Sequence, residues 1–347
     1  MISDYIDLRS DTVTKPTKAM REAMADAPVG DDQYGEDPSV TELQEYAAHL
    51  LGKHGALFVA SGTMANQIAL KLFTSPGDDV VVGRESHNVL HEAGASAANA
   101  GVQFTEIGSN GLFTAEEFRR SAKPRGHVVF PATTLVEVEN THNRGGGLVF
   151  PQEEVEKICA VARGMNIATF LDGARLFNAS VASGLELAKL AKPFDIVAVS
   201  LSKGLGAPVG SILAGEKSVL EKAVRYRRMF GGAMRQCGII AAGGLYALRH
   251  NILRLADDHH NAALIATRVA QSPKIKLDPS SVKTNIIIIH LDSNAPSAAK
   301  VVARCKEQGV LLLAFGERTV RLTTHLDVKE EACRRAADIL VRAIESN

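Results

Sequence analysis

Apolar residues in the first 245 positions form short runs that alternate with stretches of helical periodicity. The runs at 167–171 and 196–200 show no polar alternation, so we expect both faces of these strands to be buried. Buried strands separated by amphipathic helices predict a parallel or mixed sheet with helices on both faces. The same patterns predict further strands at 56–60, 79–83, 128–130 and 135–138, and helices at 38–51, 62–72 and 152–162.

The pattern changes after about residue 244, where helix, strand, helix and two strands predict a small α/β domain packed on a large one. We expect the large domain over 1–245, with an irregular N-terminal arm over 1–37, and the small domain over 246–347. The elements predicted for the small domain are a long helical stretch at 245–271, a strand at 285–290, a helix at 298–308 and strands at 310–314 and 319–323.

Charge and composition narrow the classes of protein that fit. The 347 residues hold 39 basic and 39 acidic side chains without a long run of one sign, which argues against a nucleic-acid partner because phosphates need a concentrated basic face. No apolar stretch is long enough to span a bilayer, and the acidic N-terminus is unlike a signal peptide, so no membrane partner is expected. The zero net charge leaves little repulsion between copies of the chain, which permits self-association.

The cysteines predict free thiols. They form no C-x-x-C pair and lie in predicted helices, so buried thiols are expected rather than disulfides or a zinc site. We therefore expect no metal site and a reducing, cytoplasmic setting. The four positions are Cys159, Cys237, Cys305 and Cys333.

Candidate chemistry lies at the ends of two predicted strands. Asp172 ends one buried strand, and Lys203 follows another. Ligands of an open α/β sheet bind at the carboxyl ends of its strands, so both side chains are expected to face a ligand. A lysine flanked there by small residues can have a lowered pKa and form a Schiff base. A structural ion pair between the two residues explains them equally well.

The tripeptide Ser61-Gly62-Thr63 lies between a predicted strand and a predicted helix. A helix N-terminus with small residues can bind a phosphate, although an ordinary Ser/Thr N-cap is the commoner explanation. No nucleotide P-loop motif occurs. The glycines at 204–210 do not form a dinucleotide fingerprint, because the last one is a place late and Pro208 would fall inside the required helix.

Two histidines and one arginine are further candidates. His142 follows a predicted strand in the polar cluster 139–143, and His87 precedes His91 by four residues, a metal-binding spacing for which no third ligand is evident. Each histidine alone is more often a structural residue. Arg321 lies at alternate strand spacing and could bind a substrate carboxylate, although a surface arginine fits the pattern equally well.

Together these segments resemble the threonine aldolase family of fold type I pyridoxal-phosphate enzymes. The resemblance covers nearly the whole chain, and the segments occur in the same order as in the family. It implies an aspartate-aminotransferase-like large domain with a mixed seven-stranded sheet and a small C-terminal α/β domain. The segments that carry it are 8–17, 30–38, 61–66, 139–143, 172–178, 202–211, 231–236 and 321–327.

The resemblance implies a cofactor, pyridoxal 5′-phosphate, bound covalently to Lys203. Asp172 matches the acid that keeps the pyridine nitrogen protonated. His87 matches a ring that stacks on the cofactor, and Gly62 and Thr63 match the phosphate-binding residues. Lys203, His87 and His142 are thus the implied catalytic residues, with His142 as the candidate base for the substrate hydroxyl, acting directly or through water.

The resemblance also implies substrate-binding and intersubunit roles. Arg175 matches a neighbour of the cofactor's phenolic oxygen and of the substrate, and Ser10 and Arg321 match the residues that bind the substrate carboxylate. Tyr34 and Arg235 match residues that reach the cofactor or phosphate of an adjacent subunit. A homo-oligomer, and in this family a homotetramer built as a dimer of dimers, is therefore implied.

The implied reaction is cleavage of L-threonine or L-allo-threonine, and of other β-hydroxy amino acids, to glycine and an aldehyde such as acetaldehyde. This would place the chain in threonine breakdown and glycine formation. Another fold type I lyase or an enzyme like glycine hydroxymethyltransferase shares the lysine and the aspartate. A non-catalytic pyridoxal-phosphate-binding regulator would require a DNA-binding segment, and no basic helical region in the sequence would serve as one.

Overall fold

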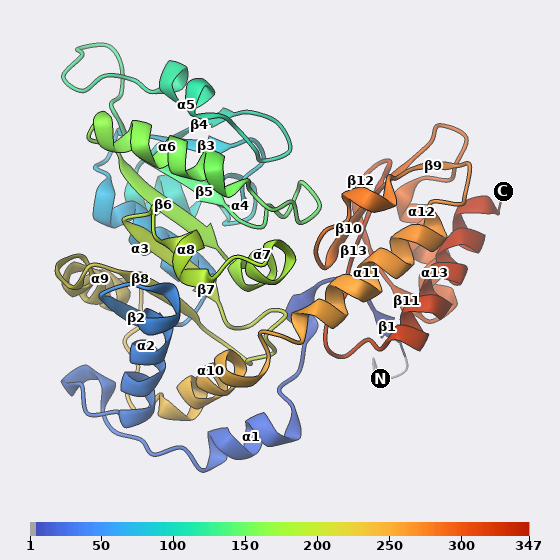
Figure 1. Cartoon of the computed structure of the whole chain (residues 1–347), viewed down its shortest axis with the longest axis horizontal. Coiled ribbons are helices and arrows are strands. Elements are labelled where there is room, and N and C mark those ends of the chain that lie inside the picture. The colour runs from blue at the N-terminus through green and yellow to red at the C-terminus, as the bar shows by residue number, and fades with distance from the viewer. Residues whose placement is uncertain (1–4, 347) are drawn as a thin grey trace.

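A mixed seven-stranded sheet forms the centre of the larger of two domains in the computed structural model, which describes residues 5–346. Its strand order is β2-β8-β7-β6-β5-β3-β4, and β8 runs antiparallel to both of its neighbours (Figure 1). The mixed sheet that the resemblance implied is confirmed. Its strands are β2 (Gly55–Val59), β3 (Asp79–Gly83), β4 (Gln103–Ile107), β5 (Thr133–Glu139), β6 (Ala168–Gly173), β7 (Ile196–Ser200) and β8 (Ser211–Gly215).

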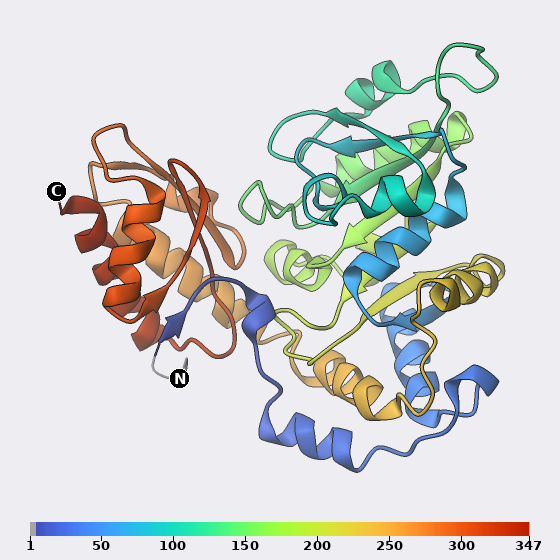
Figure 2. The ribbon, with the colours of Figure 1, turned by 180° about the vertical axis from the view of Figure 1, so that it is seen from behind.

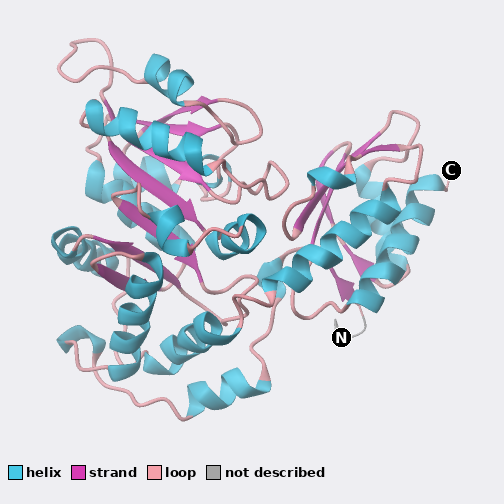
Figure 3. Ribbon diagram, viewed as in Figure 1, coloured by secondary structure: helices cyan, strands magenta, loops and turns pink. Residues whose placement is uncertain are grey.

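Alternate residues of the central strands enter two different apolar clusters. In β7, Val197 and Val199 belong to the cluster on one face of the sheet, whereas Ile196 and Ala198 belong to the cluster on the other. This two-sided burial explains why the predicted strands lack polar alternation. Helices α2, α6, α7, α8 and α10 contribute to the first cluster, and α3 and α9 contribute to the second. Figure 3 shows helices on both sides of the sheet. The helices are α1 (Lys18–Ala25), α2 (Pro38–Leu51), α3 (Gly62–Phe73), α4 (His87–Leu90), α5 (Ala115–Ser121), α6 (Gln152–Gly164), α7 (Leu176–Ser183), α8 (Leu187–Ala191), α9 (Lys217–Met229) and α10 (Gly238–His250).

The C-terminal part of the chain forms a second domain with an apolar cluster of its own. Its four-stranded antiparallel sheet has the order β12-β13-β10-β9, and three helices pack beside it (Figure 1). The elements are α11 (Leu255–Val269), β9 (Ile275–Lys276), β10 (Ile286–Leu291), α12 (Ala298–Glu307), β11 (Val310–Leu311), β12 (Leu313–Gly316), β13 (Thr319–Thr323) and α13 (Glu330–Glu345).

The N-terminal segment links the two domains. Its first strand, β1 (Ile6–Asp7), pairs in parallel with β11 of the small domain, and the backbone N–H of Thr323 donates to the carbonyl of Leu8 over 2.9 Å. The chain then passes through a short 3-10 turn, Asp11–Val13, and continues to α1 beside α10 of the large domain (Figure 2). The segment thus crosses the junction between the domains close to the carboxyl ends of the central strands.

Three sequence-based predictions of local structure are wrong. The expected strand at 128–130 is an exposed loop, where the His127 Nδ1 accepts the backbone N–H of Val129 over 3.2 Å and Val128 is 98% exposed. The expected helix at 245–271 is broken between α10 and α11 at Asn251, whose side chain donates to the carbonyl of Leu205 over 2.7 Å. The expected strand at 310–314 is divided between β11 and β12, which belong to different sheets.

None of the helices in residues 5–346 is both long and apolar enough to cross a membrane.

Candidate active site

Three acidic or basic side chains lie together where the central strands end. Glu139 and Asp172 are paired in register at the ends of β5 and β6, and Lys203 follows the neighbouring strand β7. Parallel strands bring their carboxyl ends to one edge of the sheet, which is where ligands bind in folds of this type. The sequence-based placement of Asp172 and Lys203 at this edge therefore agrees with the structure.

Asp172 is buried and accepts two hydrogen bonds. Its Oδ2 accepts from Asn66 Nδ2 over 3.1 Å, and its Oδ1 accepts from the backbone N–H of Ala174 over 3.1 Å. Asn66 belongs to the second turn of α3, so the aspartate is fixed by the helix that also offers its N-terminus to the site. A carboxylate held in this way can accept a further hydrogen bond from a cationic N–H.

Lys203 is half-buried, and its main-chain carbonyl accepts a hydrogen bond from Thr14 Oγ1 over 2.9 Å. Burial and the charge of Arg175 lower the pKa of the Lys203 amine to about 8. Among the described residues, the amine forms no ion pair within 4 Å with Asp172. A lysine with a lowered pKa and a free amine suits a nucleophile better than a structural ion pair.

Arg175 is the N-cap residue of α7, and its guanidinium forms two hydrogen bonds with Asp11, an aspartate that the sequence did not single out. Its Nε–H donates to Asp11 Oδ2 and its Nη2–H donates to Asp11 Oδ1, each over 2.7 Å. Both side chains are buried. The two parallel hydrogen bonds fix the plane of the guanidinium, which leaves Nη1 to face elsewhere.

His87 opens α4 at the edge of the site. Its backbone N–H donates to Glu139 Oε2 over 2.8 Å, and its ring Nε2 lies 3.6 Å from Glu92 Oε1. Burial lowers the pKa of His87 to about 4, so the ring is neutral near pH 7. Burial raises the pKa of Glu92, which accepts hydrogen bonds from Asn66 and Gln67, to about 7. A neutral, partly exposed ring suits stacking on a flat ligand.

His142 is completely buried beneath a turn of the chain. A Cβ atom on Gly111, where φ is +79°, would lie only 2.1 Å from the imidazole, so this turn requires a glycine. The His142 Nδ1 accepts the backbone N–H of Gly145 over 3.0 Å, and its Nε2 lies 3.5 Å from Glu139 Oε2. Burial lowers the pKa of His142 to about 4. The ring is therefore neutral, with its proton on Nε2.

Arg321 enters the site from β13 of the small domain. Its side chain is buried, and its Nη1–H donates to the carbonyl of Arg9 over 3.4 Å. No carboxylate in residues 5–346 forms an ion pair with it within 4 Å, and its Nε has no hydrogen-bond partner there. Burial and the charge of Arg175 lower the pKa of Arg321 to about 10. A buried guanidinium without a carboxylate is costly, so this arrangement favours an anionic ligand. The neighbouring Ser10 caps the 3-10 turn and accepts from Thr12.

The N-terminus of α3 offers a second place for an anion. Ser61 caps the helix by accepting the backbone N–H of Met64 over 3.1 Å, and Thr63 is exposed. A Cβ atom on Gly62 would lie 3.7 Å from Ser211 Oγ, a buried hydroxyl without a hydrogen-bond partner among the described residues. The helix dipole, the absent side chain and the unpaired hydroxyl together suit a phosphate group.

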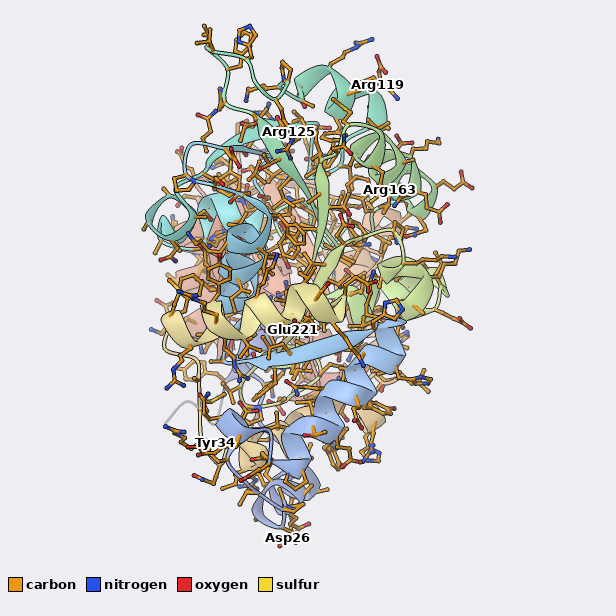
Figure 4. The ribbon with its side chains drawn as sticks, turned by 90° about the vertical axis from the view of Figure 1, so that its left-hand side faces the viewer. Asp26, Tyr34, Arg119, Arg125, Arg163 and Glu221 are labelled. Carbon is orange, nitrogen blue, oxygen red and sulfur yellow. The ribbon has the colours of Figure 1, made fainter. Side chains whose placement is uncertain are left out.

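Tyr34 and Arg235 do not join this cluster within the chain. Tyr34 is 75% exposed and lies on the outer surface below α9 (Figure 4). Arg235 is exposed too, and its Nη1–H donates to Asp31 Oδ2 over 3.1 Å.

Solved structures share this architecture. The threonine aldolase of Leishmania major superposes with a TM-score of 0.81 and 22% identity, over 97% of this chain and 98% of that one. An aspartate aminotransferase double mutant of Thermus thermophilus superposes with a TM-score of 0.76 and 16% identity, over 98% and 92%. The fold is that of fold type I pyridoxal-phosphate enzymes, and the aspartate and the lysine lie at the edge of its sheet.

Sequence relatives narrow the class. A family model described as beta-eliminating lyase matches residues 7–292. The low specificity L-threonine aldolase of Escherichia coli (strain K12) is 42% identical over 334 residues, which are 96% of this chain and 97% of that protein. Low-specificity L-threonine aldolase 1 of Arabidopsis thaliana is 39% identical over 330 residues, or 94% and 92% of the two chains. The chain belongs to the threonine aldolase family.

Proposed function

We propose that the protein cleaves L-threonine or L-allo-threonine, and related β-hydroxy amino acids, to glycine and an aldehyde, with pyridoxal phosphate bound covalently to Lys203. One observation carries the proposal. A lysine with a lowered pKa and a buried aspartate lie at one edge of the sheet, and Arg321 of the small domain is buried with no carboxylate among residues 5–346 in an ion pair with it.

The residues at this edge fit the cofactor. Asp172 would accept the pyridine N–H, and Gly62, Thr63 and Ser211 would hold the phosphate at the N-terminus of α3. His87 would stack on the ring. When bound, pyridoxal phosphate supplies an electron sink for the bonding pair that is released when a bond to the substrate Cα breaks. Arg175 would place its remaining N–H groups beside the phenolic oxygen.

Arg321 and Ser10 would bind the substrate carboxylate. Arg321 is buried and supplies N–H donors that the described part of the chain leaves unpaired, and Ser10 follows Arg9, whose carbonyl accepts from Arg321. A guanidinium binds a carboxylate through two parallel hydrogen bonds, which fixes the orientation of the amino acid about its Cα. We propose that this orientation sets the Cα–Cβ bond in the position for cleavage.

His142 would act on the β-hydroxyl group through its Nε2 atom. Its Nδ1 is engaged by Gly145, so the neutral ring carries its proton on Nε2 and is a donor there. A donor cannot take the hydroxyl proton directly. We therefore propose the water-mediated form of the base assignment, in which His142 Nε2–H orients a water and the hydroxyl proton passes through that water to the carboxylate of Glu139, whose Oε2 lies 3.5 Å from the same nitrogen.

We also propose that Tyr34 and Arg235 complete the site of a neighbouring copy in a homo-oligomer, which the family resemblance suggests is a tetramer. The exposed apolar side chains of Tyr34, Met229 and Ile239 support an interface on this face. The four cysteines are buried free thiols, and this supports a reducing, cytoplasmic setting.

The proposed function is tested by product analysis. Protein loaded with pyridoxal phosphate is incubated with L-threonine and, separately, with L-allo-threonine, and the products are quantified. Equal amounts of glycine and acetaldehyde support the proposal. Keto acid and ammonia in their place would assign the chain to a β-eliminating reaction instead.

A further inference from the structure

Asp11 lies where the N-terminal segment crosses from the small domain to the large one (Figure 2). It is the first residue of the 3-10 turn, and its side chain is completely buried. A buried carboxylate is costly unless donors surround it, so the contacts of Asp11 indicate what holds it there.

Its donors come from both domains. Arg175 of the large domain donates to both carboxylate oxygens, each over 2.7 Å. Asn285 of the small domain donates to Oδ2 over 3.0 Å and also donates to the carbonyl of Thr324 over 3.2 Å. One carboxylate of the N-terminal segment therefore joins the two halves of the molecule at the edge of the candidate active site.

Neighbouring residues of the same segment contact the other functional groups. The carbonyl of Arg9 accepts from Arg321 over 3.4 Å, and Thr14 Oγ1 donates to the main-chain carbonyl of Lys203 over 2.9 Å. Asp11 lies between these two contacts in the sequence. The N-terminal segment thus contacts all three basic residues of the site: the side chains of Arg175 and Arg321 and the main chain of Lys203. These contacts distinguish Asp11 from a member of an ordinary structural ion pair.

The negative charge of Asp11 stabilises the positive charges of Arg175, Lys203 and Arg321. Burial would raise the pKa of Asp11, but Arg175 lowers it far below its usual range, so Asp11 is an anion. The charge of Arg175 lowers the pKa of Lys203 and that of Arg321, whereas the charge of Asp11 raises both. The other acidic groups that act on Lys203 are Asp172 and Glu139. Asp11 is thus the acidic group that acts on all three cations.

We propose that Asp11 is a positioning residue that fixes the guanidinium plane of Arg175 and serves as the shared counter-charge of Arg175, Lys203 and Arg321. The inference rests on the proposed function only in taking Lys203 as the cofactor lysine. In this role Asp11 limits the effect of the Arg175 charge on Lys203. It also ties the small domain, which carries Arg321, to the domain that carries Lys203.

The test is a pH titration of the visible absorbance of protein loaded with pyridoxal phosphate, without substrate. Asp11→Asn keeps the size of the side chain and removes its charge, so the protonated form of the lysine linkage loses a stabilising anion. We expect the titration midpoint to fall by on the order of one pH unit. The matched control is Asp7→Asn, four residues earlier in the same segment, where a partly exposed carboxylate pairs with Arg9. The control midpoint should equal that of the wild type.

The double variant Asp11→Asn/Arg175→Gln shows whether a shifted midpoint in Asp11→Asn comes from the lost counter-charge or from general damage to the site. It removes the anion and the cation together, so the account predicts a return of the midpoint to the wild-type value. Because it leaves no unpaired buried charge from this pair, it also serves if Asp11→Asn alone fails to fold. A midpoint that stays low in the double variant, or that Asp11→Asn leaves unchanged, would overturn the proposal.

The titration distinguishes this inference from the proposed function. A shift in the midpoint requires only cofactor binding, so it can appear whether or not threonine is cleaved. If cleavage occurs, Asp11→Asn should lower kcat and also raise KM for threonine, and Asp7→Asn should change neither. Absence of visible absorbance in the wild type would refute the cofactor assignment and, with it, this inference.

Discussion

The backbone N–H of Gly145 donates a hydrogen bond to Nδ1 of His142, with 3.0 Å between the two nitrogens. This bond and the lowered pKa fix His142 as a neutral ring with its proton on Nε2. The candidate base identified from the sequence is therefore oriented as a donor. The same ring lies against Gly111, where a Cβ atom would be only 2.1 Å from it.

His142→Phe is expected to lower kcat about 100-fold, because loss of a group that assists proton transfer typically costs two to four orders of magnitude. The variant keeps a ring against Gly111 and removes both nitrogens. Steady-state kinetics with L-threonine and with L-allo-threonine would measure the rate and the preference between them, and the absorbance of the bound cofactor should persist. Unchanged rates for both substrates would show that His142 has no part in the proton transfer.

Glu139→Gln is expected to damage the site more than Glu137→Gln does. Glu139 accepts the backbone N–H groups of His87 and Asn143, each over 2.8 Å, and an amide can accept only one of them. Leaving one buried N–H without an acceptor costs about 1–3 kcal/mol. The unfolding temperature and kcat should therefore both be lower for Glu139→Gln than for Glu137→Gln.

Glu137 is the matched control because it lies two residues earlier on β5 and is equally buried. Burial raises its pKa well above the usual range, which favours the uncharged carboxyl and makes an amide a close replacement. Its Oε2 accepts only from Asn88. Equal losses in the two variants would mean that Glu139 has no special role in holding His87.

Cofactor capture should depend on pH through Lys203. Burial and Arg175 lower its pKa to about 8, and only the neutral amine attacks an aldehyde. The rate at which the cofactor-free protein gains visible absorbance from added pyridoxal phosphate should rise as pH increases toward 8 and level off above it. A rate that keeps rising up to pH 10 would indicate an ordinary lysine.

Arg321→Gln should weaken binding of the amino acid. A charge-assisted hydrogen bond contributes about 1.5–3 kcal/mol, so KM for threonine should rise on the order of 100-fold. Arg318→Gln is the control, since Arg318 lies in the same hairpin and donates to the carbonyl of Ala295. Similar KM values for the two variants would remove Arg321 from the carboxylate site.

Mixed oligomers would test the intersubunit roles. Lys203→Ala and the double variant Tyr34→Ala/Arg235→Ala are each expected to be inactive, or nearly so, as pure proteins. When they are unfolded and refolded together, some interfaces should unite an intact Lys203 with an intact Tyr34 and Arg235 from the other copy, and activity should return. No recovery in refolded mixtures that are shown to contain both chains would place each site within one subunit.

Local patterns predict the strand ends but not the groups that surround them. Asp172 and Lys203 follow apolar runs, so their place at the sheet edge could be inferred before the fold was known. Asp11 lies 164 residues from Arg175 and Asn66 lies 106 residues from Asp172, and no periodicity relates such pairs. Their contacts arise only when the strands, the helices and the N-terminal segment come together.

Apolar character alone also misplaced one element and missed another. The run at 128–130 has the composition of a strand, but it lies in an exposed loop between α5 and β5. Strand β8 is central and fully buried, yet it follows a glycine-rich loop and contains a glycine, so its sequence gives little strand signal. Whether an apolar run is buried depends on which other segments of the fold pack against it, and the local sequence pattern does not show this.

The most direct test of the central claim is to trap the cofactor on its lysine. Protein loaded with pyridoxal phosphate is reduced with sodium borohydride and digested, and the peptides are mapped by mass spectrometry. The account predicts a pyridoxyl-phosphate adduct on Lys203 and none on that peptide in Lys203→Ala. An adduct on a different lysine, or no adduct in a protein that still forms glycine and acetaldehyde, would contradict it.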